Sequence, residues 1–173
     1  MPIQDTLNQV NTLATHTALS AWAVAGDFVI VLIIFGALFF FAWYVGRGPF
    51  VALLLALYAA YAVYLVFPYA GLLPTAPALT ALLARVALYG AFVVVVYLIL
   101  RRVVVSDFLY VGLFGLIALS FLGATFLLAL AYQAFPVSAV YHFTPAVDAI
   151  FAPKAYFFWW FIAPLLGLFF LAR

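Results

Sequence analysis

The sequence predicts an all-α fold, a polytopic bundle of helices within a lipid bilayer, on the strength of two observations. Hydrophobic residues make up 72% of the 173 residues and charged residues only 6%, whereas soluble domains are roughly half apolar and about a quarter charged. Five continuous apolar runs also reach the length of about 20 residues that a helix needs to cross a membrane. Because four acidic and six basic residues could not cover a water-soluble globule of this size, we expect lipid to cover most of the chain.

The five runs are bounded by residues that start or end helices. Inside hydrocarbon, a continuous apolar run pairs its backbone groups as a helix, and it lacks the alternating pattern of barrel strands. Gly46 and Pro49 favour a tight hairpin between the first two helices. Asp27 and Asp107 precede the first and fourth runs, where we expect each carboxylate to cap a helix start. The expected spans are residues 28–46, 50–69, 81–100, 108–131 and 155–172, in one bundle domain of residues 27–173.

Two shorter segments lie outside the expected spans. Residues 1–26 lack the pattern of a cleavable signal peptide. Their apolar residues recur at helical spacing, which fits a short amphipathic helix at the membrane interface as well as a disordered leader. In residues 133–153, Thr144-Pro145 is typical of a helix start and Pro153 of a helix end, which predicts a short surface or re-entrant helix.

Basic residues set the expected orientation, because short loops rich in arginine stay on the cytoplasmic side. With five spans and an external amino terminus, four basic residues lie inside and two lie outside, so we expect the amino terminus outside. Four spans are the alternative, with residues 81–100 or residues 155–172 lying in the interface. The inner set is Arg47, Arg101, Arg102 and Arg173, and the outer set is Arg85 and Lys154.

Arg85 lies about one turn inside the third run, among apolar residues. A charged side chain costs about 2.5–3.5 kcal/mol at the centre of a spanning helix and much less near its end. One interpretation is that Arg85 extends along its aliphatic stem to the lipid headgroups. The other interpretation is that Arg85 lines an aqueous cleft or binds an anion.

Three tyrosines and a set of small residues mark the second and fourth runs. Tyr58, Tyr61 and Tyr64 recur every third residue, which places their phenols on one broad helical face. They are candidates to line a solute path or, alternatively, to pack by hydrogen-bonding neighbouring carbonyls. The fourth run is rich in glycine and alanine, and its only serine and threonine are Ser120 and Thr125. Because small side chains let helix backbones approach closely, we expect the fourth run to be the most buried helix.

The sequence identifies no catalytic, cofactor-binding or metal-ligating residue, and no cofactor is expected. The absence of cysteine excludes disulfides, thiolate metal sites and a cysteine nucleophile, and the chain has no serine-hydrolase, zinc-protease or phosphate-loop motif. Its scattered charges form no basic patch, so nucleic acid is not an expected partner. His16, His142 and Asp148 fall on the expected outer side and are the candidates for a metal or proton-responsive site there.

Several short motifs within residues 27–131 carry a family resemblance. Asp27 opens the first span, Arg47-Gly48 separates the first two, and Ser106-Asp107 precedes Phe114-Gly115 in the fourth. In these features the chain resembles the colicin V production protein family of small bacterial inner-membrane proteins. It departs from the family pattern after Gly48 and after Gly115, where the family carries charge and this chain is apolar. The resemblance implies a bacterial inner-membrane protein, without an assigned reaction, linked to export or envelope homeostasis.

Two functional hypotheses follow for the whole chain. The first is a non-enzymatic multi-pass protein of the bacterial plasma membrane, acting in export or envelope homeostasis or as a subunit of a membrane complex. It implies the bilayer and either a second copy of the chain or another membrane protein as partners. The alternative is a small-solute transporter or channel, with the tyrosine face and Arg85 lining the path.

Overall fold

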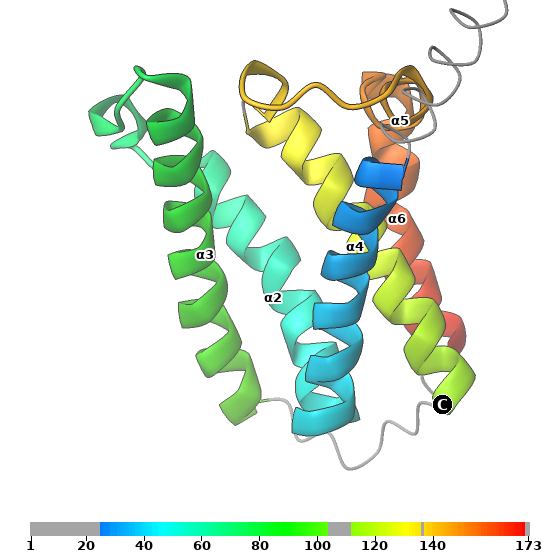
Figure 1. The fold of residues 1–173 in the computed structure, drawn as a ribbon. Helices are drawn as coiled ribbons and strands as arrows, with labels where there is room; N and C mark the ends of the chain where they lie inside the picture. Colours follow the sequence, from blue (N-terminus) through cyan, green and yellow to red (C-terminus); the bar gives the residue numbers. More distant parts are fainter. Residues whose placement is uncertain (1–24, 104–111, 136, 172–173) are drawn as a thin grey trace, which may run out of the picture.

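The computed structural model describes residues 25–103, 112–135 and 137–171, and its regular elements there are all helical. Five of these helices are long and apolar enough to cross a membrane, and they run side by side as a bundle (Figure 1). This arrangement confirms the predicted all-α fold, with five helices that could serve as the predicted spans. The helices are the first helix (Ala25–Val45), α2 (Arg47–Leu65), α3 (Ala78–Val103), α4 (Leu113–Ala134) and α6 (Lys154–Leu171).

A single residue, Gly46, connects the first helix to α2. Its φ of 111° lies in the left-handed region, where only glycine is unstrained, so the chain reverses direction without a loop. The amide N–H of Phe50 donates to the carbonyl oxygen of Gly46 at 3.2 Å, and Pro49 occupies the first turn of α2. The tight hairpin predicted from glycine and proline is therefore confirmed.

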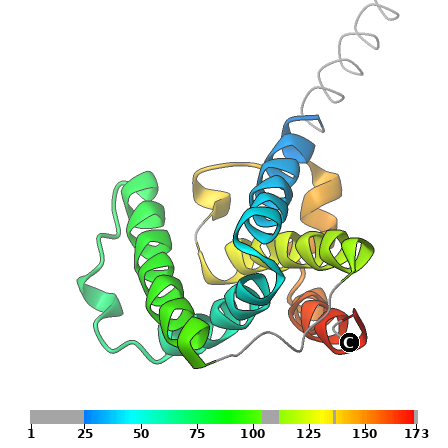
Figure 2. The ribbon, with the colours of Figure 1, turned by 90° about the horizontal axis from the view of Figure 1, so that it is seen from below.

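The five-helix bundle contains two closely packed helix pairs. Helix α2 packs along α3, and α4 packs along α6. Viewed along the bundle, α3 and α6 lie on opposite sides (Figure 2). Each of the five helices contains an apolar stretch of 18 residues. In α4, 61% of this stretch is buried inside the protein, against 39% in α2 and 6–11% in the other three helices. The prediction that the fourth run is the most buried helix is confirmed.

Two glycines allow α4 to approach its neighbours closely. A Cβ atom at Gly123 would lie 2.9 Å from Leu54 Cδ2 of α2 and 3.1 Å from Leu38 Cδ1 of the first helix. A Cβ atom at Gly167 of α6 would lie 2.7 Å from Leu122 Cδ1 of α4. Lipid tails are as apolar as leucine, so close van der Waals packing of this kind, rather than removal from water, holds spanning helices together.

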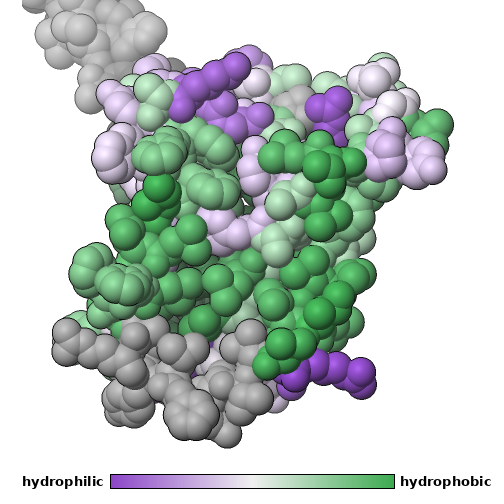
Figure 3. All heavy atoms as spheres, turned by 180° about the vertical axis from the view of Figure 1, so that it is seen from behind, coloured by the Kyte–Doolittle hydropathy of each residue, from purple (hydrophilic) through white to green (hydrophobic). Residues whose placement is uncertain are grey.

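An apolar belt surrounds the middle of the molecule. Figure 3 shows hydrophobic residues across the central part of one face and hydrophilic residues near both ends. Large apolar side chains point outward from several helices, including Phe40 of the first helix, Leu83 of α3 and Phe169 of α6. Helix α3, with 26 residues, is about 39 Å long and so exceeds the ~30 Å hydrocarbon core.

A short helix, α5 (Pro145–Phe151), lies at the end of the bundle where the first helix begins (Figure 1). Thr144 is its N-cap residue and Pro145 its first residue, while Pro153 follows its end, as the sequence predicted. Two single turns of 3-10 helix complete the described connections, η1 (Ala70–Leu72) and η3 (Val137–Ala139).

One predicted helix cap is wrong. Asp27 lies inside the first helix rather than before it, and its carboxylate accepts hydrogen bonds from Tyr141 and Thr144, beyond α4, instead of from amides of its own helix. The other predicted cap, Ser106-Asp107, lies outside the described residues, as does the predicted amphipathic segment up to residue 24.

Candidate functional site at one end of the bundle

Asp27 is buried, with 1% of its surface exposed, and accepts three hydrogen bonds. The backbone N–H and the hydroxyl of Thr144 donate to Asp27 Oδ2 at 2.7 and 2.6 Å. The hydroxyl of Tyr141 donates to Asp27 Oδ1 at 3.1 Å. A buried carboxylate is costly unless donors satisfy it, and these three donors come from a segment more than 110 residues away in the chain.

A second carboxylate binds the same short segment to α4. The hydroxyl of Tyr132 in α4 donates to Asp148 Oδ1 in α5 at 2.6 Å. The Tyr132 ring lies 5.2 Å from the Phe143 ring and 6.3 Å from the Phe151 ring, so aromatic side chains enclose this bond. We call Asp27, Tyr132, Tyr141, Thr144 and Asp148 the carboxylate cluster.

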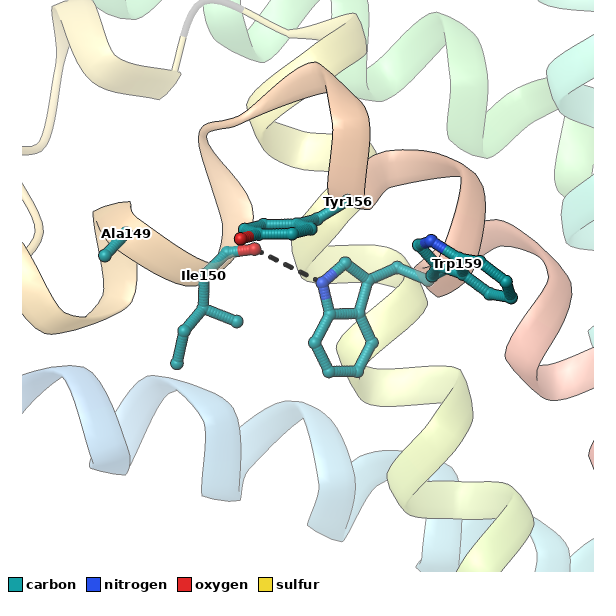
Figure 4. Close-up of a pocket in the computed structure, with 5 residues that line it drawn as sticks. Ala149, Ile150, Tyr156 and Trp159 are labelled. Carbon is teal, nitrogen blue, oxygen red and sulfur yellow. Dashed lines mark hydrogen bonds between the residues drawn. The ribbon is translucent and has the colours of Figure 1, made fainter.

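Helix α5 is held at both ends by side chains of other elements. A helix of seven residues has too few internal hydrogen bonds to be stable alone. At its start, Thr144 turns its hydroxyl to Asp27 instead of capping the helix. At its end, the Trp160 indole N–H donates to the Ile150 carbonyl at 3.3 Å (Figure 4), and Gln133 Nε2 donates to the Ala152 carbonyl at 3.0 Å. Contacts with the first helix, α4 and α6 therefore determine where α5 lies.

The cluster is acidic and depends on neutral donors. In the described part of the chain, neither Asp27 nor Asp148 forms an ion pair with a basic side chain. The hydrogen bond that Tyr141 donates to Asp27 raises the pKa of Tyr141, and partial burial and the nearby negative charge act in the same direction. The arrangement therefore favours the neutral phenol, which connects the first helix to the segment before α5.

The predicted tyrosine face lies between the two helix pairs. Tyr58 stacks on Phe126 of α4, with ring centroids 4.5 Å apart, and its hydroxyl donates to the Phe161 carbonyl of α6 at 2.6 Å. Tyr61 lies 6.1 Å from the Phe161 ring. Tyr64 lies edge-on to Phe135, at 5.6 Å. The face that was a candidate for a path or for packing thus contacts α4, α6 and the residue that follows α4.

The remaining candidates from the spans lie apart from one another. The Thr125 hydroxyl donates to the Leu122 carbonyl of its own helix at 2.9 Å, and Ser120 is fully buried. Ser120 Oγ has no hydrogen-bond partner in the part of the chain that the structure describes. Arg85 is partly buried, about 10 Å along α3 from its first residue, and forms no ion pair with any described residue.

Only one of the three predicted outer-surface residues belongs to the carboxylate cluster. Asp148 is a member, His142 is exposed beside Tyr141 without a bond to either carboxylate, and His16 lies outside the described residues. Among the described residues, no three potential ligands gather as a metal site would require. Sequence reasoning missed Tyr132, Tyr141 and Thr144 as partners of the acids. The available signal was Asp27 itself, because an acid at a spanning helix needs a donor from elsewhere.

The fold and its composition define the class of the protein, a helical membrane protein with five potential spans. Comparison with protein-family models, with curated proteins and with solved structures gives no match. The resemblance to the colicin V production protein family therefore stays a prediction.

Proposed function

We propose that this chain is a non-enzymatic, multi-pass protein of the bacterial plasma membrane that works as a subunit of a membrane complex, in export or envelope homeostasis. Its amino terminus lies outside, with Arg101 and Arg102 at the inner end of α3. The observation that carries the proposal is the exposed surface of α3, the longest described helix.

Helix α3 offers a long surface for another membrane protein. Only 6% of its apolar 18-residue stretch is buried inside the protein. Within the chain, α3 packs mainly against α2. Its exposed apolar residues extend over most of its length, and Arg85 lies among them without an ion pair to any described residue. Arginine within a spanning helix usually pairs with an acid or reaches headgroups, so an acidic side chain of a partner would suit this surface. The exposed apolar residues include Leu79, Leu83, Val86, Val94, Val95, Leu98 and Ile99.

The use of polar side chains inside the spans also supports the proposal. Tyr58 donates to α6, Tyr89 donates to the Leu57 carbonyl at 2.9 Å, and Thr125 donates within α4. The two tyrosines hold helices of the chain to one another, and Thr125 is satisfied within its own helix. Such a use of hydroxyl groups favours a structural role over chemistry at a site within the membrane.

Site-specific photocrosslinking tests the proposal. A photoreactive amino acid at Leu83 or Val94 of α3 should yield one discrete protein adduct in native membranes, identified by mass spectrometry. The matched control is the same amino acid at Phe169, an exposed position of α6 on the other side of the bundle. Adducts of equal yield from both helices, or only lipid adducts from α3, would count against a specific partner.

A transport assay provides an independent test. The proposal predicts no solute flux in liposomes beyond that of empty vesicles. Flux that is present with the native chain and lost with Tyr61→Phe combined with Arg85→Ala would support the transporter hypothesis instead.

A further inference from the structure

Three neighbouring hollows on the surface share lining residues. The first, of about 270 Å³, lies between the first helix and α4 and includes Leu32 and Phe35. The second, of about 240 Å³, extends to α5 and shares Phe28, Val31 and Phe121 with the first. The third, of about 510 Å³, lies between α5 and α6 and shares Ile150 and Trp160 with the second. We call the first two hollows the inner groove and the third the aromatic mouth.

The wall of the inner groove is apolar in effect. Among the described residues that line it, Asp27 and Thr125 are the only polar ones besides Trp160, whose indole N–H donates to the Ile150 carbonyl. The oxygens of Asp27 are taken up by Thr144 and Tyr141, and the hydroxyl of Thr125 donates to the Leu122 carbonyl. Neither residue therefore presents an unsatisfied group to the groove, and an occupant must be apolar.

The dimensions and position of the inner groove fit a hydrocarbon chain. From Asp27 to Phe35 it follows the first helix for about 12 Å, close to the roughly 15 Å half-thickness of a hydrocarbon core. Phe28 and Phe121, on its rim, are 69% and 51% exposed on spanning helices, so the groove is continuous with the lipid-facing surface. The surrounding bilayer is thus the nearest source of an occupant.

The aromatic mouth suits the other end of a lipid. Tyr156 and Trp159 are exposed there, and their O–H and N–H groups have no acceptor among the described residues. Figure 4 shows this hollow, with the Trp160–Ile150 hydrogen bond in its wall. Tyrosine and tryptophan at the end of a spanning helix lie at the level of lipid headgroups, whose ester and phosphate oxygens accept such donors.

We propose that the inner groove binds one acyl chain of a phospholipid, whose glycerol and headgroup lie over the aromatic mouth. The site is distinct from the surface of α3, and its occupation does not depend on a protein partner. The bound chain contacts the first helix, α4 and α5 together, so it supports α5 beside the carboxylate cluster.

Photolabelling from the lipid phase tests this site. The chain is placed in nanodiscs of phosphatidylethanolamine and phosphatidylglycerol that contain a trace of phosphatidylethanolamine with a diazirine in one acyl chain. Irradiation inserts the lipid carbene into nearby side chains, which mass spectrometry then locates. The proposal predicts at least about fivefold more label on Val31 and Phe121 than on Leu166 and Phe169, exposed residues of α6 that lie outside both the groove and the α3 surface, a preference of about 1 kcal/mol.

Equal labelling of the groove and of the α6 residues would mean only bulk lipid contact and would overturn the proposal. Exclusion of label from Val31 and Phe121, with the α6 residues labelled, would show that protein fills the groove and would also overturn it. Val31→Trp should fill the groove and remove the excess label from Phe121, while Val95→Trp should leave it unchanged. The native labelling ratio decides the question even where the Val31→Trp chain does not fold.

Discussion

Asp27 in the first helix and Thr144 at the start of α5 are joined by two hydrogen bonds, of 2.7 Å from the Thr144 backbone N–H and 2.6 Å from its hydroxyl. The bonds connect residues 117 positions apart in the sequence. They explain how a helix of seven residues keeps its place at the end of the bundle. They also give the buried carboxylate of Asp27 the donors that it needs.

Removal of the Thr144 hydroxyl should loosen α5. Thr144→Val keeps the shape of the side chain and removes one donor to a carboxylate, a bond worth about 1.5–3 kcal/mol. We expect the free energy of unfolding in detergent micelles to fall by this amount and the amides of α5 to exchange hydrogen faster. Thr144→Ser keeps the hydroxyl and is the control. Equal stability of the Val and Ser variants would contradict the role of this bond.

Gly123 should not tolerate a methyl group. In Gly123→Ala the new Cβ atom meets the ends of two buried leucine side chains, Leu54 and Leu38, at 2.9 and 3.1 Å, so these side chains or α4 must shift, at a cost of about 1–3 kcal/mol. Gly90→Ala in α3 is the matched control, because nothing lies within 4 Å of a Cβ atom there. The control should be neutral or slightly more stable, since alanine favours helix over glycine by about 1 kcal/mol. Thermal unfolding of both variants checks the difference, and equal melting temperatures would refute it.

Tyr58→Phe tests the contribution of the Tyr58 hydroxyl to stability separately from that of the ring. The variant keeps the stack on Phe126 and loses the hydrogen bond to the Phe161 carbonyl, so we expect a loss of about 0.5–1.5 kcal/mol in stability. Tyr44→Phe is the control, because Tyr44 is 91% exposed and makes no interaction with a described residue. Stability is measured by unfolding in detergent with a graded denaturant. A loss that is the same for both variants would argue against the bond.

The raised pKa of Tyr141 predicts a dependence on alkaline pH. Because the folded state raises this pKa through the bond to Asp27, the stabilisation is complete below the ordinary tyrosine pKa of about 10 and is lost as pH rises through the higher folded value. Hydrogen exchange of α5, corrected for its intrinsic pH dependence, should therefore accelerate above about pH 10. Tyr141→Phe should already be less protected at neutral pH and should show a smaller alkaline change. An unchanged alkaline transition in this variant would assign the effect to another group.

The spans and their turns follow from local features of the sequence. Apolar length predicts each spanning helix, and the boundaries differ from prediction by a few residues. Gly46 and Thr144-Pro145 mark a hairpin and a helix start because their own backbone preferences determine the local structure. The burial of α4 follows from its small residues for the same reason.

The carboxylate cluster does not follow from local features. An aspartate beside an apolar run can cap its own helix or accept hydrogen bonds from a distant segment. The residue type does not distinguish these two roles, and the sequence predicted the wrong one for Asp27. Spacing also does not pair Tyr132 with Asp148, because the intervening turn decides how α5 folds back on α4. The groove is harder still to predict, since its walls come from helices that meet only in the folded bundle.

Native mass spectrometry of the chain, extracted from its own membrane in polymer-bounded nanodiscs, tests the proposed role in a membrane complex most directly. The proposal predicts a particle that contains this chain with a second protein or a second copy in fixed ratio. It also predicts that aspartate in place of two exposed α3 residues, Leu83→Asp with Val94→Asp, dissociates the particle while the chain remains folded. A single chain with lipid alone, in the native protein as in the variant, would contradict it.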